Sequence, residues 1–176
     1  MKRKEILPIV LLASYFQRSP LVFVTQPNIK TPADLRGKVI MGTSDELKYS
    51  SLALLLSHYN ISPQNTSITA EKFSIDDFID GKVDAMSAFL SNQIYELNQR
   101  KVAYNIINPA DYGFIMSAAQ SVLQPGRGAQ TIPDAPRRFL QATNKGWHYA
   151  FDHPEETIQI IHNKYAPPKA FGRLAL

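Results

Sequence analysis

The chain has 176 residues, of which 44% are hydrophobic and 19% charged, a composition typical of a folded globular protein and not of a disordered one. It contains no cysteine, which excludes disulfides, thiolate metal sites and cysteine nucleophiles. The net charge of +4 is concentrated near the N-terminus, around Lys2, Arg3 and Lys4, and does not form the basic stripe with interleaved aromatics that binds nucleic acid. No apolar run approaches the roughly 18 residues that a membrane-spanning helix needs, so no direct membrane span is expected.

Two short apolar runs begin the chain. Residues 6–14 and 21–25 are aliphatic or β-branched, and the polar stretch 17–20 between them predicts a turn, so we expect two strands. The first run follows a basic start and so resembles the apolar part of a signal peptide. However, Glu5 precedes it and no small-residue cleavage site follows Ala13, which makes a buried strand the better interpretation.

A helical turn, a strand and a long helix are predicted next. Thr31 and Pro32 are typical of the start of a helical turn, and Gly37 is typical of its end. The apolar stretch 38–42 then predicts a buried strand. A long helix is expected over 43–60, because capping residues stand at its start and leucines recur along one face.

The alternation of strands and helices continues to residue 108. Residues 66–73 alternate like a half-buried strand, and 74–81 predict a short helix that closes with a glycine. Residues 83–90 contain many good helix formers, yet a glycine stop precedes them and the start of a helix over 91–101 follows. We therefore interpret 83–90 as a buried strand, and 102–108 as the next strand.

The C-terminal part of the sequence predicts two helices over 133–165, joined at residues 152–154. The stretch 114–132 before them shows neither the helical nor the strand period. No secondary structure is predicted for that stretch.

This order of elements indicates an α/β fold, in which ligands bind beyond the carboxyl ends of strands, near helix N-termini. Two such corners follow the predicted strands 38–42 and 83–90, and their residues are Gly42, Thr43, Ser44, Asp45, Phe89, Ser91 and Asn92. Gly42 would let a ligand approach the backbone. Tyr15, Phe16 and Tyr112, like Phe89, lie near element ends and could stack on a small planar ligand. Capped helices and ordinary cores use the same residue types, so a purely structural role stays open.

No pattern predicts catalysis, a metal site or a cofactor. His148 and His153 lie five residues apart, with no carboxylate repeated at ligand spacing near them, and the glycines at 126 and 128 are not followed by a phosphate-loop lysine. The acid pairs Asp76–Asp77 and Glu155–Glu156 fall in the first turns of predicted helices, where the helix dipole favours negative charge. We expect these pairs to be structural, and the protein not to be an enzyme.

Four segments carry a resemblance to a known family: TPADLRGKVIMG (31–42), GKVDAMSAFLSN (81–92), NPADYG (108–113) and GWHYAFDHPEETIQII (146–161). With them the chain resembles bacterial solute-binding proteins of the thiamine-pyrimidine-precursor and sulfonate-binding kind, in a branch often fused to sensor kinases. The first segment is common across type II binding proteins. The combination of all four is much more specific.

The resemblance implies an α/β fold of the type II periplasmic binding protein kind, with one complete three-layer lobe and part of another. Residues 1–30 would be a partial first lobe, 31–103 the second lobe, and 104–176 the return to the first lobe with the C-terminal helices. The ligand would lie in the cleft between lobes, and the family's contacts carry over onto Gly42, Thr43, Ser44, Ser91 and Asn92. The residue after that asparagine is usually glutamate in the family, whereas this chain has Gln93. The chain would also be N-terminally incomplete, and its 114–132 stretch departs from the family pattern, consistent with a frame-shifted reading of the gene.

The function implied is the capture of a small polar or heteroaromatic metabolite by the solute-binding component of an ABC-type importer, outside the cytoplasm and with a permease as partner. An alternative is the extracytoplasmic ligand-sensing domain of a histidine kinase or diguanylate cyclase. A minor alternative is a pyrimidine-precursor synthase-like enzyme. Those enzymes use a cysteine-rich motif and a lysine-bound pyridoxal phosphate, and this chain has no cysteine, so no cofactor is expected.

Overall fold

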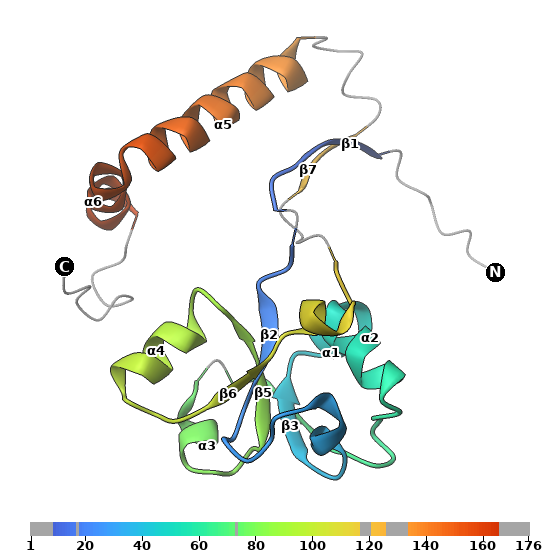
Figure 1. Ribbon diagram of the computed structural model, residues 1–176. Coiled ribbons are helices and arrows are strands. Elements are labelled where there is room, and N and C mark those ends of the chain that lie inside the picture. The colour runs from blue at the N-terminus through green and yellow to red at the C-terminus, as the bar shows by residue number, and fades with distance from the viewer. Residues whose placement is uncertain (1–8, 17, 73, 117–120, 126–133, 166–176) are drawn as a thin grey trace. The chain divides into compact units, whose positions relative to one another are not determined.

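The computed structural model describes residues 9–16, 18–72, 74–116, 121–125 and 134–165 (Figure 1). The contacts within the chain divide it into two compact units. Ser14–Ser121 is named the sheet unit, and Met1–Ala13 together with Val122–Leu176 is named the terminal unit. These divisions differ from the expected lobe boundaries after residues 30 and 103, and the assignment of residues to two lobes stays a prediction.

The sheet unit is built on a five-stranded mixed sheet with the order β4-β3-β5-β2-β6. Its strands are β2 (Leu21–Thr25), β3 (Val39–Gly42), β4 (Ser67–Ala70), β5 (Ala85–Phe89) and β6 (Asn105–Ile107). β3 runs parallel to both β4 and β5, whereas β2 is antiparallel to both β5 and β6. All five residues of β2 are buried, as expected for a strand covered on both faces.

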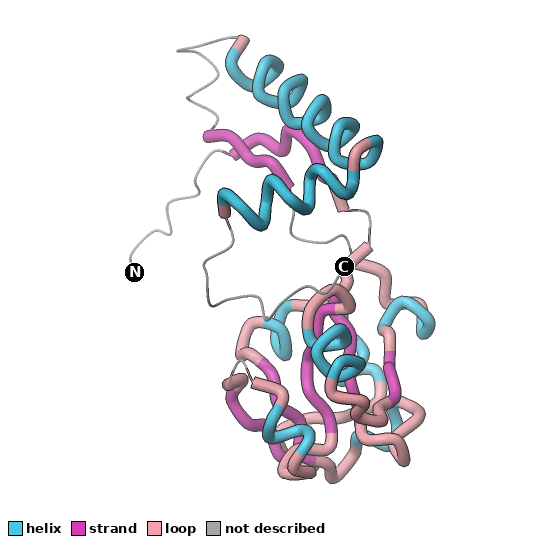
Figure 2. The backbone as a smooth tube through the Cα atoms, turned by 90° about the vertical axis from the view of Figure 1, so that its left-hand side faces the viewer, coloured by secondary structure: helices cyan, strands magenta, loops and turns pink. Residues whose placement is uncertain are grey.

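Helices cover both faces of this sheet (Figures 1 and 2). They are the 3-10 helices η1 (Pro32–Leu35) and η2 (Pro109–Tyr112) and the α-helices α1 (Glu46–Tyr49), α2 (Ser51–His58), α3 (Asp76–Ile79) and α4 (Gln93–Gln99). Phe23 and Ile40 share one buried cluster with Leu52, Leu55 and Leu56 of α2. Val22 and Met41, their neighbours along the strands, share the other with α3 and α4. The period-two alternation of the strands therefore produces the expected three layers.

The structure confirms the strand predicted over 83–90. Residues 85–89 form β5, and α4 begins directly after Asn92. The glycine stop before the strand has the expected conformation, since Gly81 has a φ of +70°. The order of stop and start signals thus outweighed the helix propensity of this stretch.

The single long helix predicted over 43–60 is wrong, because the chain breaks it into α1 and α2 at Ser50. Ser50 is extended, with φ −108° and ψ 179°, and its hydroxyl accepts a hydrogen bond from the Leu52 amide at 3.0 Å. The same hydroxyl donates to the carbonyl of Glu46. Serine side chains compete with backbone hydrogen bonds in this way, so Ser50 ends one helix and caps the next.

The terminal unit contains a two-stranded sheet of β1 (Ile9–Ser14) and β7 (Ser121–Pro125), and two helices. The helices α5 (Ala135–Asp152) and α6 (Pro154–Lys164) meet at His153, where the sequence predicted a break. β7 lies in the stretch 114–132, for which no strand was predicted. Residues 117–120 and 126–132 of that stretch lie outside the described residues.

Candidate functional site

The two predicted ligand corners lie at one edge of the sheet. β3 and β5 are parallel neighbours, with Ile40 opposite Ala85 and Met41 opposite Met86, so both strands end at the same edge. Residues 43–45 follow β3 there and residues 90–92 follow β5. This edge, made of these two loops, is named the carboxyl edge.

A carboxylate already accepts hydrogen bonds from one backbone amide of the first loop and from one hydroxyl of β5. The backbone amide of Thr43 donates to Oε2 of Glu46 at 3.1 Å, and the amide of Glu46 donates in return to Oγ1 of Thr43 at 3.3 Å. The hydroxyl of Ser87, a buried residue of β5, donates to the same Oε2 at 2.8 Å. The sequence pattern of a capping box, with threonine followed by glutamate three residues later, could have indicated the first pair. No sequence pattern indicates the contact with Ser87.

The second loop also satisfies most of its own amides. The amide of Phe89 donates to Oε1 of Gln93 at 2.9 Å, and that of Asn92 donates to the carbonyl of Phe89 at 3.0 Å. The amide of Leu90 donates to the carbonyl of Pro20 at 3.1 Å. The side chain of Asn92 makes no capping bond to α4. The side chains of Ser91 and Asn92 are exposed, so they are the polar groups of this loop that remain accessible.

Gly42 is buried, and the protein itself fills the space beside it. A Cβ at this position would lie 3.0 Å from the Ser87 hydroxyl and 3.2 Å from the Leu47 side chain. Glycine fits the close approach of these side chains, and the approach of a ligand to its backbone stays a prediction. Thr43 is half-buried and Ser44 and Asp45 are exposed, so these neighbours carry the accessible surface of the loop.

The four predicted aromatic residues do not form one group. Phe89 ends β5 at the carboxyl edge with 40% of its surface exposed, and it pairs with Leu21 at the start of β2. Tyr15 and Phe16 lie in the segment that leads into that strand. Tyr112 lies on η2 and makes an edge-to-face contact with Tyr59, with ring centroids 6.2 Å apart.

The surroundings of Tyr112 also affect its ionisation. Desolvation, together with the nearby Tyr59 and Asp111, raises the pKa of Tyr112.

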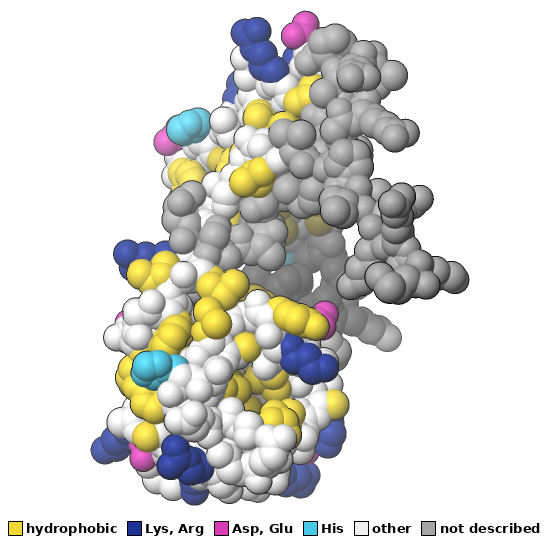
Figure 3. Space-filling view, turned by 90° about the vertical axis from the view of Figure 1, so that its right-hand side faces the viewer, with side chains coloured by type: hydrophobic (Ala, Val, Ile, Leu, Met, Phe, Trp, Pro, Cys, Tyr) yellow, Lys and Arg dark blue, Asp and Glu magenta, His cyan; other side chains and the backbone are white. Residues whose placement is uncertain are grey.

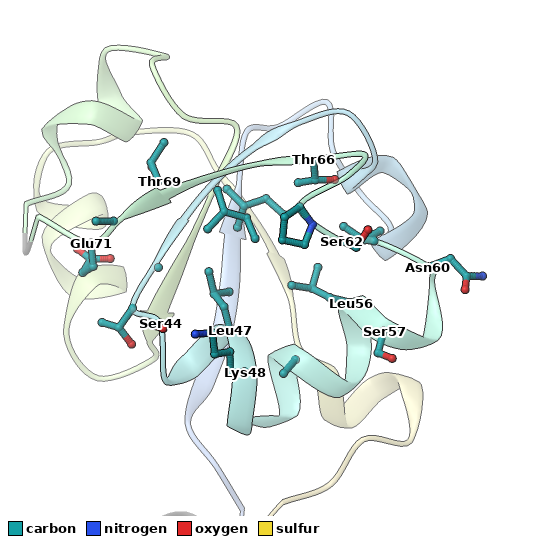
Figure 4. Close-up of a pocket in the computed structure, with 18 residues that line it drawn as sticks. Ser44, Leu47, Lys48, Leu56, Ser57, Asn60, Ser62, Thr66, Thr69 and Glu71 are labelled. Atoms are coloured by element: carbon teal, nitrogen blue, oxygen red, sulfur yellow. The ribbon is translucent and has the colours of Figure 1, made fainter.

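A groove of about 950 Å³ lies between α1–α2 and the edge strand β4 (Figure 4). Gly42, Thr43 and Ser44 belong to its lining, which joins it to the carboxyl edge. Leu47 and Lys48 extend from the helical side, as Figure 4 shows. The rest of the lining, much of it from α2 and β4, is largely apolar and includes Leu56, Ile61, Pro63 and Ile68. The space-filling view of this side shows hydrophobic side chains within the hollow of the sheet unit (Figure 3).

The described residues contain no group of three or more histidine and acidic side chains that could hold a metal ion. The acid pair of α3 is engaged with cations: Asp76 pairs with Arg100 at 2.7 Å and Asp77 with Lys72 at 2.5 Å. Hydrogen bonds from Ser74 and Arg100 lower the pKa of Asp76. The predicted position of this pair in the first turn of a helix is confirmed, and its structural role stays a prediction. In the part of the chain that the structure describes, no helix has the length and apolar character needed to cross a membrane.

Residues 1–157 match the NMT1/THI5 like family. The chain belongs to this family. The riboflavin-binding protein RibY of Chloroflexus aurantiacus is 25% identical over 184 residues, which cover all of this chain and 50% of that protein.

Solved structures show the fold. The periplasmic aliphatic sulphonate-binding protein SsuA of Escherichia coli superposes with a TM-score of 0.67 at 17% identity, over 89% of this chain and 54% of that one. SsuA of Xanthomonas axonopodis pv. citri, bound to MOPS, gives 0.64 at 14% identity over the same shares. The chain therefore spans about half the length of the relatives that it matches. The mixed α/β fold of type II periplasmic binding proteins, which the sequence resemblance implied, is confirmed.

Proposed function

We propose that the chain is part of a solute-binding protein that captures a small polar or heteroaromatic metabolite and presents it to an ABC-type permease outside the cytoplasm. Membership of the NMT1/THI5 like family supports this proposal. So do the names of its relatives, a riboflavin-binding protein and two sulfonate-binding proteins. The proposed role is binding, without a chemical step.

The observation that carries the proposal is the shared edge of β3 and β5. Parallel strands that end together bring their loops together, and open α/β sheets bind ligands at such edges. Ser44, Ser91 and Asn92 are exposed in the two loops, and Phe89, which is 40% exposed, ends β5 at the same edge. A few polar groups next to an aromatic face suit a small polar or heteroaromatic molecule.

In the proposed mechanism the carboxyl edge forms one wall of the ligand cleft, and a second lobe supplies the opposite wall. The ligand would bind the closed arrangement more tightly than the open one, so binding would shift the population toward closure. Ser44 and Asn92 would hydrogen-bond to the polar rim of the ligand, and Phe89 would stack on its face.

A thermal-shift screen tests the proposal with pyrimidines, flavins, sulfonates, amino acids and polyamines. A ligand that binds only the folded protein raises Tm in a concentration-dependent way. Replacing Asn92 with alanine should weaken the best compound by about 1–3 kcal/mol, because a buried partner of the amide would lose its hydrogen bond. Gln99→Ala, at the exposed far end of α4, is the control and should bind as the wild type does. An affinity that Asn92→Ala leaves unchanged would remove that residue from the site.

A further inference from the structure

Glu46 brings together donors from two strands that are distant in sequence. A capping box explains the reciprocal bonds between Thr43 and Glu46. It does not explain why the buried hydroxyl of Ser87, 41 positions away, donates to the same carboxylate oxygen at 2.8 Å. That contact exists because β5 lies beside β3, with Ser87 next to Gly42. The Glu46 carboxylate therefore occupies a donor pair built by both strands of the carboxyl edge.

We infer that Glu46 determines the ligand specificity of the carboxyl edge: it excludes anionic ligands and selects ligands that donate N–H groups, whether neutral or cationic. This inference rests on the proposed binding site at that edge. It goes further by naming the charge class of the ligand and the residue that sets it.

Exclusion of anions follows from the positions of the donors. The Thr43 amide and the Ser87 hydroxyl are the kind of donors that a sulfonate or carboxylate group requires, and both already donate to Oε2 of Glu46. An anionic ligand would have to displace that carboxylate or lie beside it. Two like charges close together in a partly desolvated site repel strongly, at a cost of several kcal/mol.

Selection of N–H donors follows from the other carboxylate oxygen. The Glu46 carboxylate accepts its hydrogen bonds from described residues through Oε2 and none through Oε1. Oε1 can therefore accept a hydrogen bond from a ligand. A carboxylate is an acceptor only, and a hydrogen bond from a cationic N–H to it is roughly twice as strong as a neutral one.

The charged residues next to Glu46 in the sequence do not neutralise its carboxylate. The ion pairs between described residues do not include Glu46. Asp45 precedes it with an exposed side chain, and Lys48 follows within the same short helix but is exposed and lines the groove. Gln93, at the start of the helix that follows the second loop, is neutral and holds the Phe89 amide. The formal charge of residues 45–48 is −1.

Two probes that share one ring and differ in charge test the inference. The full ¹⁵N-labelled chain is titrated with benzamidinium and, separately, with benzenesulfonate, and the amide signals of Thr43 and Phe89 are followed. In the wild type, benzamidinium should shift these signals and benzenesulfonate should not. Glu46→Gln keeps the side-chain shape and one oxygen acceptor but removes the charge. It should bind benzenesulfonate about 10-fold more tightly than the wild type and benzamidinium about 10-fold more weakly.

Asp80→Asn is the matched control, because it removes the same unit of charge at the turn before β5, away from the carboxyl edge. The Asp80 side chain is exposed and pairs only with Lys82 among the described residues, so this variant should change either affinity less than about 2-fold. Ser87→Ala keeps the Glu46 charge and removes one of its two donors, and it should keep the wild-type preference. A selectivity switch in Asp80→Asn or in Ser87→Ala would overturn the assignment to Glu46.

Two further outcomes separate this inference from the proposed function. If benzenesulfonate shifts the Thr43 amide of the wild type as strongly as that of Glu46→Gln, the inference fails while the binding site stands. If neither probe shifts these amides in any variant, the carboxyl edge is not a ligand site, and the proposed function fails as well.

Discussion

The sheet unit and the terminal unit differ in how they bury their apolar residues. Among the residues whose burial the structure describes, every buried one belongs to the sheet unit, and Phe23, Ile40 and Leu55 are completely inaccessible. The helices α5 and α6 of the terminal unit have no buried residue at all. Phe139 of α5 is 55% exposed and Phe151 is 75% exposed.

This difference shows that amphipathic sequence and a packed core are separate properties. The apolar residues of α5 recur at helical spacing, as do those of α6, so both sequences favour helices with an apolar stripe. Most helix stability in proteins comes from packing that stripe against other elements. The packed core of the described residues lies in the sheet unit, and we expect this core to supply most of the free energy of unfolding. The apolar stripes of α5 and α6 contribute little by burial.

Replacing one phenylalanine in each unit tests this comparison most strongly. Phe23→Ala should destabilise the protein by about 3–5 kcal/mol, because it leaves a cavity in the core on one face of β2. Phe139→Ala is the matched change on α5 and should cost less than about 1 kcal/mol. Urea unfolding followed by circular dichroism measures both values. Equal losses would show that the two units are packed equally well, contrary to the comparison.

A part-buried hydrogen bond at the start of β3 sharpens the comparison within the sheet unit. Oδ2 of Asp84 accepts from the Val39 amide at 2.8 Å, and the Asp84 amide donates to the Val39 carbonyl at 2.9 Å. Asp84→Ala removes the acceptor for an amide of β3 and should cost about 1–3 kcal/mol in the same assay. Asp80→Ala, which loses only an exposed ion pair to Lys82, should cost much less. If the two losses were equal, the Asp84 bond would count as an ordinary surface contact.

Much of the sheet unit could be predicted from sequence because its signals are local. The strand β5 was identified from the stop and start signals on either side of it, even though its residues favour a helix. The break at Ser50 could not be predicted, since the leucine stripe continues across it. β7 carries no clear period of its own, so sequence gave no signal for it; the fold places it beside β1.

The candidate site was predictable in place but not in detail. The expectation that residues 43–45 and 90–92 follow strands required only the order of elements, and the structure places both loops at one edge. The contact between Glu46 and Ser87 depends on the register of β3 against β5, which no local pattern encodes. The contact between Tyr112 and Tyr59 likewise could not be predicted, because the two rings are distant in sequence.

The smallest expected effect concerns an exposed turn of the sheet unit and is visible as a pH dependence. Oδ2 of Asp34 accepts from the amide and hydroxyl of Thr31, each at 2.9 Å, and from the Lys30 amide at 3.1 Å, and these bonds lower the pKa of Asp34. A pKa that is lower in the folded state than in the unfolded state contributes stability above the unfolded value of about 3.9, and this contribution is lost as the pH falls through the folded value.

Asp34→Asn should therefore lose less stability than the wild type between about pH 4 and pH 2, as measured by urea unfolding across that range. Asp111 stands at the same position of the second Pro-Ala-Asp turn, and its carboxylate accepts no hydrogen bond among the described residues, so Asp111→Asn is the matched control. It should follow the wild-type pH profile. Parallel profiles for Asp34→Asn and the wild type would show that the Thr31 bonds do not persist in solution, and that this exposed turn contributes as little to stability as the exposed faces of α5 and α6.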